Sequence, residues 1–216
     1  MFKVAIFDLD GTLLNTIDDL ANACNYALSK FSFPTHESEK YKTFIGNGLY
    51  KLVERALPLE YRDSETVNMV LDVFNKYYNE HMMDMTRPYN GIIDLLDQLI
   101  DEGIGLAVVS NKKHDFTLEI IHKYFSDRFK IVLGLRENYK AKPDPTSVLE
   151  VIDEFGISKE ECIYIGDSNV DIRTARNAGV KSIGVSWGFR GGEELLKEGA
   201  DYLVNNVEEL KEIIIS

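Results

Sequence analysis

The chain has 216 residues, 44% hydrophobic and 28% charged, which is enough for one large or two small globular domains. Its 24 basic and 36 acidic residues give a formal net charge of −12, which disfavours binding to nucleic acid and to anionic membranes. No apolar run approaches the ~18 residues that a membrane span needs. Only Cys24 and Cys162 are present, so neither a disulfide framework nor a zinc site is supported. We expect a cytoplasmic protein with no nucleic-acid or membrane partner.

The N-terminal segment KVAIFDLDGT, residues 3–12, is the most informative part of the chain. Its apolar run, residues 4–7, is typical of a buried parallel strand. Asp8 and Asp10 follow it, and side chains two residues apart in an extended segment project to the same side. Two carboxylates that lie close together repel each other, unless a cation lies between them or one is protonated. The pair therefore predicts either a divalent metal or a protonated acid where this strand ends.

Other interpretations of this segment fit less well. An Asp-Gly hairpin turn needs a second alternating strand, which residues 13–19 do not provide. An EF-hand calcium loop needs an oxygen ligand, Gly and Glu at its fifth, sixth and twelfth positions, where this chain has Thr12, Leu13 and Asp19. The glycines of a dinucleotide fingerprint and the lysine of a Walker phosphate loop are also missing.

Beyond this segment the hydrophobic pattern divides the chain. Residues 15–86 have helical periodicity throughout, whereas strands and helices alternate from residue 88 onward. The alternation predicts an α/β fold, a doubly wound, mostly parallel, Rossmann-like sheet with helices on both faces. We therefore expect residues 1–14 and 87–216 to form the core, and residues 15–86 to form an all-helical cap domain inserted after the first strand. Such an insert would lie over the carboxyl end of that strand as a lid.

Polar residues follow three later strands. Ser110 and Asn111 follow one, Lys142 precedes a proline ahead of a helix, and Asp167 and Asp171 follow another strand. Each has an ordinary explanation as a helix cap, a first-turn carboxylate or a solvated lysine. These explanations do not account for the groups occurring together, because the carboxyl ends of parallel strands meet at one edge of a sheet. The combined pattern predicts a site for phosphate and metal beside the first pair of aspartates.

These four segments, in this order, resemble the motifs of the haloacid dehalogenase superfamily. The resemblance covers the whole chain, because residues 15–86 are similar to the helical cap of that superfamily's first cap class. Within the superfamily the chain looks most like the phosphoglycolate phosphatases. That likeness is carried by residues 9–14, by FIGNGLYKLVERAL at 44–57, and by VSWGFRGGEEL with GADYLV near the C-terminus.

The resemblance implies a phosphatase that forms an aspartyl-phosphate intermediate. Asp8 would be the nucleophile, and Asp10 the general acid and then the general base. A second aspartate would have no task in a dehalogenase, because a halide leaves without a proton; Asp10 therefore favours phosphate chemistry.

The resemblance also implies Mg²⁺, which suits an all-oxygen site. Its ligands would be the side chains of Asp8 and Asp167 and the backbone carbonyl of Asp10, with Asp171 behind them. Ser110, Asn111 and Lys142 would bind the transferring phosphoryl group.

The substrate is expected to be 2-phosphoglycolate or a similar small phosphorylated metabolite. Candidate donors for its carboxylate are Asn47, Lys51 and Arg55, or the amides of residues 46–48; Lys51 and Arg55 could equally be a solvated helix face. Inorganic pyrophosphate, a sugar phosphate, phosphomutase activity and a non-catalytic phosphoryl-binding protein remain alternatives. The chain would be a monomer or a homodimer.

Overall fold

The computed structural model describes residues 2–216. The chain forms two compact units, Met1–Leu14 with Pro88–Ser216, and Asn15–Arg87. Leu14–Asn15 (β2) and Arg87–Pro88 (β3), where the chain passes from one unit to the other, form a two-stranded sheet. None of the helices in the described residues is both long and apolar enough to cross a membrane.

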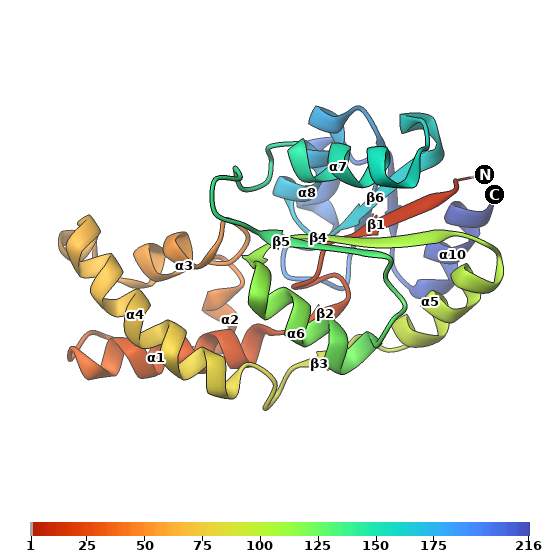
Figure 1. The fold of residues 1–216 in the computed structure, drawn as a ribbon. Coiled ribbons are helices and arrows are strands. Elements are labelled where there is room, and N and C mark those ends of the chain that lie inside the picture. The colour runs from red at the N-terminus through yellow and green to blue at the C-terminus, as the bar shows by residue number, and fades with distance from the viewer. Residues whose placement is uncertain (1) are drawn as a thin grey trace. The chain divides into compact units, whose positions relative to one another are not determined.

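The first unit contains a six-stranded sheet with the order β5-β4-β1-β6-β7-β8, in which every neighbouring pair is parallel (Figure 1). Its strands are β1 (Val4–Phe7), β4 (Gly105–Lys113), β5 (Ile131–Leu135), β6 (Cys162–Gly166), β7 (Lys181–Val185) and β8 (Tyr202–Val204). The first strand lies in the middle because the chain adds β4 and β5 on one side of it and β6, β7 and β8 on the other. An open parallel sheet binds its ligands at such a switch point, at the carboxyl ends of the strands.

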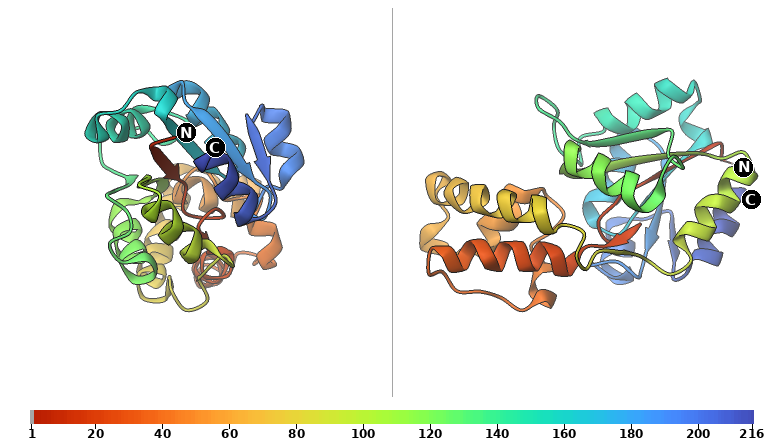
Figure 2. Two further views of the ribbon diagram at one scale, coloured as in Figure 1. Left: turned by 90° about the vertical axis from the view of Figure 1, so that its right-hand side faces the viewer. Right: turned by 60° about the horizontal axis from the view of Figure 1, so that its bottom comes forward.

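Helices cover both faces of this sheet, as the views of Figure 1 and Figure 2 show. They are α5 (Ile92–Asp101), α6 (His114–Phe125), α7 (Thr146–Phe155), α8 (Asn169–Ala178), α9 (Gly192–Glu198) and α10 (Val207–Ile215), with a 3₁₀ turn at Lys159–Glu161. Both faces of the central strands are apolar, since all four residues of β1 are buried. This accounts for the continuous apolar runs in the sequence and confirms the predicted doubly wound α/β fold.

Alternate residues of the central strands enter different cores. Val4, Ile6, Ala107, Val109, Cys162 and Tyr164 pack with α7 and α8 in one buried cluster. On the opposite face the ring of Phe7 meets Phe129 edge-on, with the ring centroids 6.2 Å apart, and Phe129 meets Phe125 of α6 in the same way. Burying large side chains on both faces fixes the register of these strands.

The second unit is built from helices, α1 (Ile17–Lys30), α2 (Ser38–Tyr41), α3 (Leu49–Ala56) and α4 (Ser64–His81), with a 3₁₀ turn at Leu59–Tyr61. Val67, Val70, Phe74 and Tyr78 are fully buried and repeat at helical spacing on α4. The longest helices of the unit, α1 and α4, pack against each other, and Tyr26 stacks on Tyr77 with the ring centroids 4.2 Å apart. The expected all-helical insert is therefore present.

Candidate active site

Strand register brings the polar residues to one edge of the sheet. Phe7 pairs with Val108 of β4 and with Ile165 of β6. Asp8 directly follows Phe7, while Ser110 and Asp167 each lie two residues beyond those partners. The three side chains therefore start from neighbouring positions on three adjacent strands, directly after β1 and β6 and in the second half of β4.

Asp8 is buried, with 8% of its surface exposed, and its Oδ1 lies 2.8 Å from Nζ of Lys142. Burial raises the pKa of Asp8 to about 7, and the nearby charge of Asp171 acts in the same direction. The ammonium of Lys142 opposes this rise without cancelling it. The carboxylate form of Asp8 therefore needs more positive charge than Lys142 supplies.

Lys142 connects two of the aspartates. Its Nζ lies 2.7 Å from Oδ1 of Asp171 and 2.8 Å from Oδ1 of Asp8, and it also donates to the hydroxyl of Tyr164. Burial alone would lower the pKa of this lysine, but Asp171 and Asp8 outweigh it and hold the pKa well above its usual value. Lys142 is therefore a fixed, buried cation beside Asp8.

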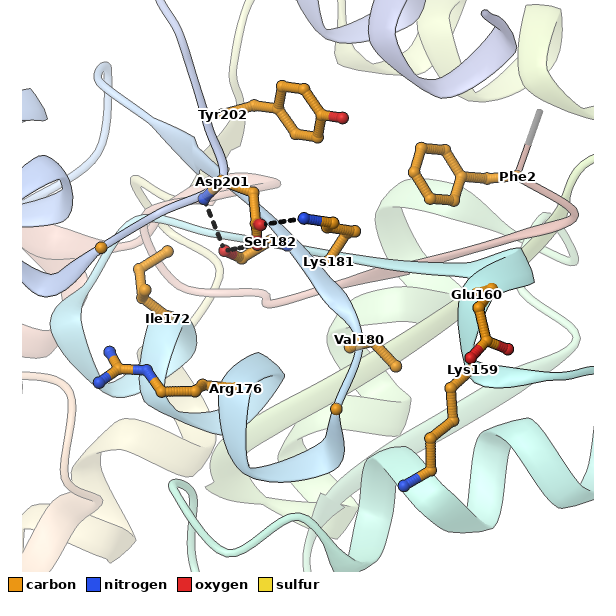
Figure 3. A pocket seen from close by; sticks show the side chains of 12 residues that line it. Phe2, Lys159, Glu160, Ile172, Arg176, Val180, Lys181, Ser182, Asp201 and Tyr202 are labelled. Carbon is orange, nitrogen blue, oxygen red and sulfur yellow. Dashed lines mark hydrogen bonds and ion pairs between the residues drawn. The ribbon is translucent and has the colours of Figure 1, made fainter.

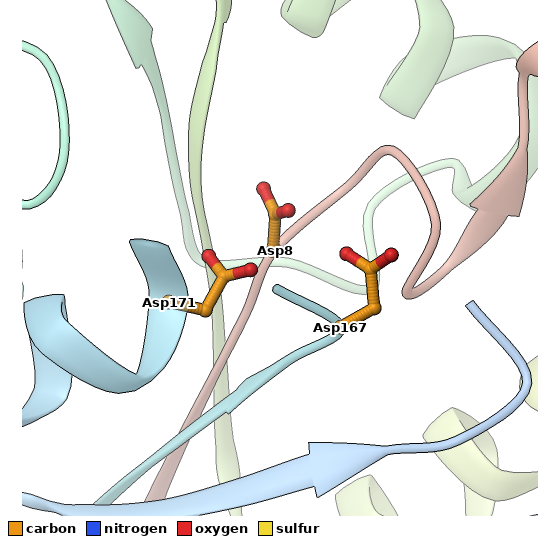
Figure 4. A group of neighbouring side chains, drawn as sticks. All are labelled: Asp8, Asp167 and Asp171. Carbon is orange, nitrogen blue, oxygen red and sulfur yellow. The ribbon is translucent and has the colours of Figure 1, made fainter. Parts of the chain in front are cut away.

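Asp8, Asp167 and Asp171 form a cluster in which each offers one oxygen within 4.8 Å of the others. Figure 4 shows the carboxylates reaching the same region from β1, from the end of β6 and from the first turn of α8. Burial, followed by the charges of Asp171 and Asp8, raises the pKa of Asp167 well above its usual value. Such crowding of buried carboxylates is relieved by a divalent cation, so the donor set suits a hard cation such as Mg²⁺.

The oxygens of Asp171 are largely occupied within the protein. Its Oδ1 accepts from Lys142, while its Oδ2 accepts from the backbone N–H and the hydroxyl of Ser168, at 3.1 and 2.6 Å. Asp167 accepts one bond from the backbone N–H of Phe189, at 2.7 Å to Oδ2. Asp167 therefore has more freedom than Asp171 to hold a metal, and Asp171 is suited to fixing Lys142 and the start of α8.

Asp10 has a partner that sequence analysis missed. Nζ of Lys112 lies 2.8 Å from Oδ1 and 3.0 Å from Oδ2 of Asp10. The Lys112 side chain is fully buried, whereas 14% of the Asp10 side chain is exposed. The only available signal was a lysine following Ser110 and Asn111, because the contact spans 102 residues of sequence.

Ser110 and Asn111 lie inside β4, not in a turn after it, because β4 extends to Lys113 with a register shift between Val109 and Lys113. The Asn111 side chain donates to the carbonyl of Lys142 and accepts from its N–H, at 3.2 and 2.7 Å. The Asn111 side chain therefore holds the Lys142 segment, and its contact with a phosphoryl group stays a prediction. The hydroxyl of Ser110 is buried and accepts from the Lys112 N–H.

The three candidate substrate residues lie in the second unit. Arg55 donates to Oδ1 of Asn47 at 2.6 Å and to the carbonyl of Phe44 at 2.8 Å. Lys51 forms an ion pair with Glu54 at 2.6 Å, and 48% of its side chain is exposed. Asn47 and Arg55 therefore stabilise the loop before α3, and Lys51 matches the alternative of a solvated helix face.

A pocket of about 660 Å³ lies elsewhere in the first unit (Figure 3). It is lined by residues at the amino ends of strands, among them Phe2, Lys181 and Tyr202. Asp201 there pairs with Lys181 and with the N–H and hydroxyl of Ser182. Because the aspartates lie at the carboxyl ends of the strands, this pocket is not part of their site.

Comparison with known proteins identifies the family of this chain. The family described as haloacid dehalogenase-like hydrolase matches residues 5–185. The chain belongs to this family. The match runs from β1 to the end of β7 and so includes Asp8, Asp10, Lys142 and Asp167.

Several haloacid dehalogenase-like relatives are similar along nearly their whole length. A phosphoglycolate phosphatase from Thiobacillus denitrificans is 32% identical over 211 residues, which are 96% of this chain and 93% of that protein. A proposed phosphoglycolate phosphatase from Lactobacillus delbrueckii subsp. bulgaricus has a crystal structure with a TM-score of 0.95 and 36% identity, covering 99% and 98% of the two chains. A predicted phosphatase from Clostridium acetobutylicum has a TM-score of 0.89 and 28% identity, covering 100% and 99%.

Proposed function

We propose that the chain is a magnesium-dependent phosphatase that hydrolyses a small phosphomonoester through an aspartyl-phosphate on Asp8. The observation that carries this proposal is the buried Asp8 carboxylate held against Lys142, with Asp10 two residues further on and Asp167 beside it. The similarity to phosphoglycolate phosphatases over whole chains supports the same reaction.

In the first step an oxygen of Asp8 attacks phosphorus, and the bond from phosphorus to the ester oxygen breaks. Asp10 gives a proton to the leaving oxygen, so an alcohol departs and an acyl phosphate remains on Asp8. In the second step Asp10 takes a proton from water, whose oxygen attacks phosphorus. Inorganic phosphate leaves, and the carboxylate of Asp8 is restored.

The surrounding residues supply charge and position. Lys142 neutralises Asp8 and the equatorial phosphoryl oxygens, and Asp171 fixes Lys142 for this task. The hydroxyl of Ser110 donates to the phosphoryl group. Mg²⁺, held by Asp8, Asp167 and the backbone carbonyl of Asp10, would stabilise the charge that phosphoryl transfer builds up.

The substrate we propose is 2-phosphoglycolate or a close analogue, on the strength of the relatives. We also propose that the helical unit, Asn15–Arg87, is a cap that excludes water during turnover, with hinges at residues 15–16 and 87–88.

The experiment that tests the function is phosphate release from a panel of esters, with magnesium and with chelator. The panel contains 2-phosphoglycolate, hexose phosphates, nucleotides and pyrophosphate. We expect magnesium-dependent turnover with a preference for 2-phosphoglycolate, and almost none from Asp8→Asn, which removes the nucleophile. A preference for pyrophosphate or a sugar phosphate would contradict the substrate. Turnover above a few per cent in Asp8→Asn would contradict the mechanism.

A further inference from the structure

Residues 187–189, the Trp-Gly-Phe of the VSWGFRGGEEL stretch, take no part in the reaction just described. They follow β7 and contact both Asp167 and the turn after β1. We propose that they are positioning residues of the metal site, which hold the Asp167 carboxylate at a fixed place beside the turn that carries the Asp10 carbonyl. This inference rests on the proposed function, because it takes Asp167 and Asp10 to be metal ligands.

Strand pairing brings this segment to Asp167. The strands β6 and β7 are parallel neighbours, and Gly166 pairs with Gly184. Asp167 directly follows Gly166, and the chain runs on from Gly184 through the end of β7 into residues 187–189. The backbone N–H of Phe189 then donates to Oδ2 of Asp167, at 2.7 Å. This bond fixes the orientation of a buried carboxylate, as hydrogen bonds behind a metal ligand do.

Gly188 allows the segment to pass this close to the carboxylate. A Cβ on Gly188 would overlap Cβ of Asp167, and it would lie 2.5 Å from Oδ2 of Asp167 and 2.5 Å from the carbonyl oxygen of Gly11. The φ of Gly188 is not in the left-handed region, so lack of space and not backbone conformation excludes a side chain here. A Cβ and a backbone oxygen cannot turn aside as the end of a long side chain can. Any larger residue must therefore displace Asp167 or the turn after β1.

Trp187 ties the same segment to the turn after β1. Its indole Nε1–H donates to the carbonyl of Thr12, at 3.1 Å. Thr12 is fully buried and lies two residues beyond Asp10. The segment thus contacts Asp167 directly and the loop of the Asp10 carbonyl through Thr12. Because Mg²⁺ demands near-ideal octahedral geometry, the spacing of these two ligands decides how well it binds.

The test measures the binding of Mn²⁺, a cation that suits the same oxygen ligands, from the loss of the electron paramagnetic resonance signal of the free ion. For Gly188→Ala we expect the dissociation constant of Mn²⁺ to rise about 10- to 100-fold, the usual effect of losing a group that orients a metal ligand. Gly192→Ala is the matched control. The φ of Gly192 is also outside the left-handed region, and an added Cβ first meets Cδ2 of Leu203, at 3.0 Å, which is the movable end of a side chain. This variant should leave the dissociation constant unchanged.

The titration gives the number of sites and the dissociation constant separately. A loss of folded protein lowers the number of sites and leaves the dissociation constant as it is. If Gly188→Ala does not fold, Trp187→Phe carries the test, because it keeps an aromatic ring and removes the N–H donor. We expect its dissociation constant to rise about 2- to 10-fold, the effect of losing one hydrogen bond.

An unchanged dissociation constant in the folded variant, or an equal rise in Gly192→Ala, would overturn the inference. If the unsubstituted protein binds no Mn²⁺, the proposed metal site fails, and the inference fails with it. If the protein binds Mn²⁺ but releases no phosphate from any ester, the proposed reaction fails, while a weaker binding of Mn²⁺ by Gly188→Ala still supports the inference.

Discussion

At the scale of single residues, the site is dominated by buried carboxylates without enough positive charge. Asp8 and Asp167 both have raised pKa values because they are buried next to other acids. Lys142 supplies one positive charge within 3 Å of Asp8 and Asp171. The protein therefore holds a high-energy arrangement that a divalent cation would relieve.

This arrangement predicts an unusual dependence of stability on pH in the metal-free protein. The pKa of Asp8 is about 7 when folded and about 4 when unfolded, so the folded state binds the extra proton between these values. Stability should therefore fall as the pH rises from 5 to 8, and magnesium should reduce the fall. Thermal unfolding across this range, with chelator and with magnesium, measures it.

Acids with lowered pKa values, such as the half-buried Glu198 at about 2, do not contribute to this dependence on pH, because they are largely ionised in both states above pH 5. Asp8→Asn removes one of the two buried acids with raised pKa values and should therefore make the slope of the profile smaller. A flat profile in the unsubstituted protein, or an equal slope in Asp8→Asn, would contradict our account of this carboxylate.

Sequence analysis identified the aspartates and Lys142 because their positions follow from strand ends. It did not predict the contact of Lys112 with Asp10 or that of the Asn111 side chain with Lys142. Where a long or polar side chain points depends on contacts with distant segments, here Asp10 and Lys142, and local sequence does not encode these.

At the scale of elements, the site depends on a tight approach between the turn after β1 and the end of β6. Gly11 holds a φ of +88°, and a Cβ on it would lie 2.6 Å from Cγ of Asp167. Gly11 therefore meets two requirements, a left-handed backbone and the absence of a side chain.

We predict that Gly11→Ala lowers kcat about 100-fold, because it displaces the Asp167 carboxylate by more than the geometry tolerates. Gly103→Ala is the control. Gly103 has a similar φ of +78° but nothing within 4 Å of an added Cβ, so it reports backbone strain alone, about 1–2 kcal/mol. Kinetics and chemical denaturation of both variants separate the two effects. Equal losses of activity would contradict the close approach at Gly11.

Most elements could be predicted from the sequence, because buried parallel strands are short apolar runs and helices have a strong period. The helix Gly192–Glu198, α9, was not predicted, since its seven residues contain few apolar positions. The strand Gly105–Lys113 extends beyond its apolar run. In the sequence Ser110 and Asn111 resemble turn residues, but in the structure both are buried within the strand.

At the scale of the whole molecule, the fold explains why residues from distant parts of the sequence form one site. The chain leaves the sheet after β1, forms the helical unit, and returns to add strands on both sides of β1. The alternation of strands and helices predicted a parallel sheet. It did not predict the strand order, which depends on where each crossover returns and not on any local pattern.

The central claim is that Asp8 carries the phosphoryl group during turnover. The direct measurement is to quench the enzyme with acid during hydrolysis of 2-phosphoglycolate, reduce any acyl phosphate with borohydride, and locate the modified residue by mass spectrometry. We predict that Asp8 is the modified residue, that modification requires magnesium, and that Asp10→Asn, which cannot activate water, alters its level. Steady turnover with no modification at Asp8, or modification at another carboxylate, would contradict the account.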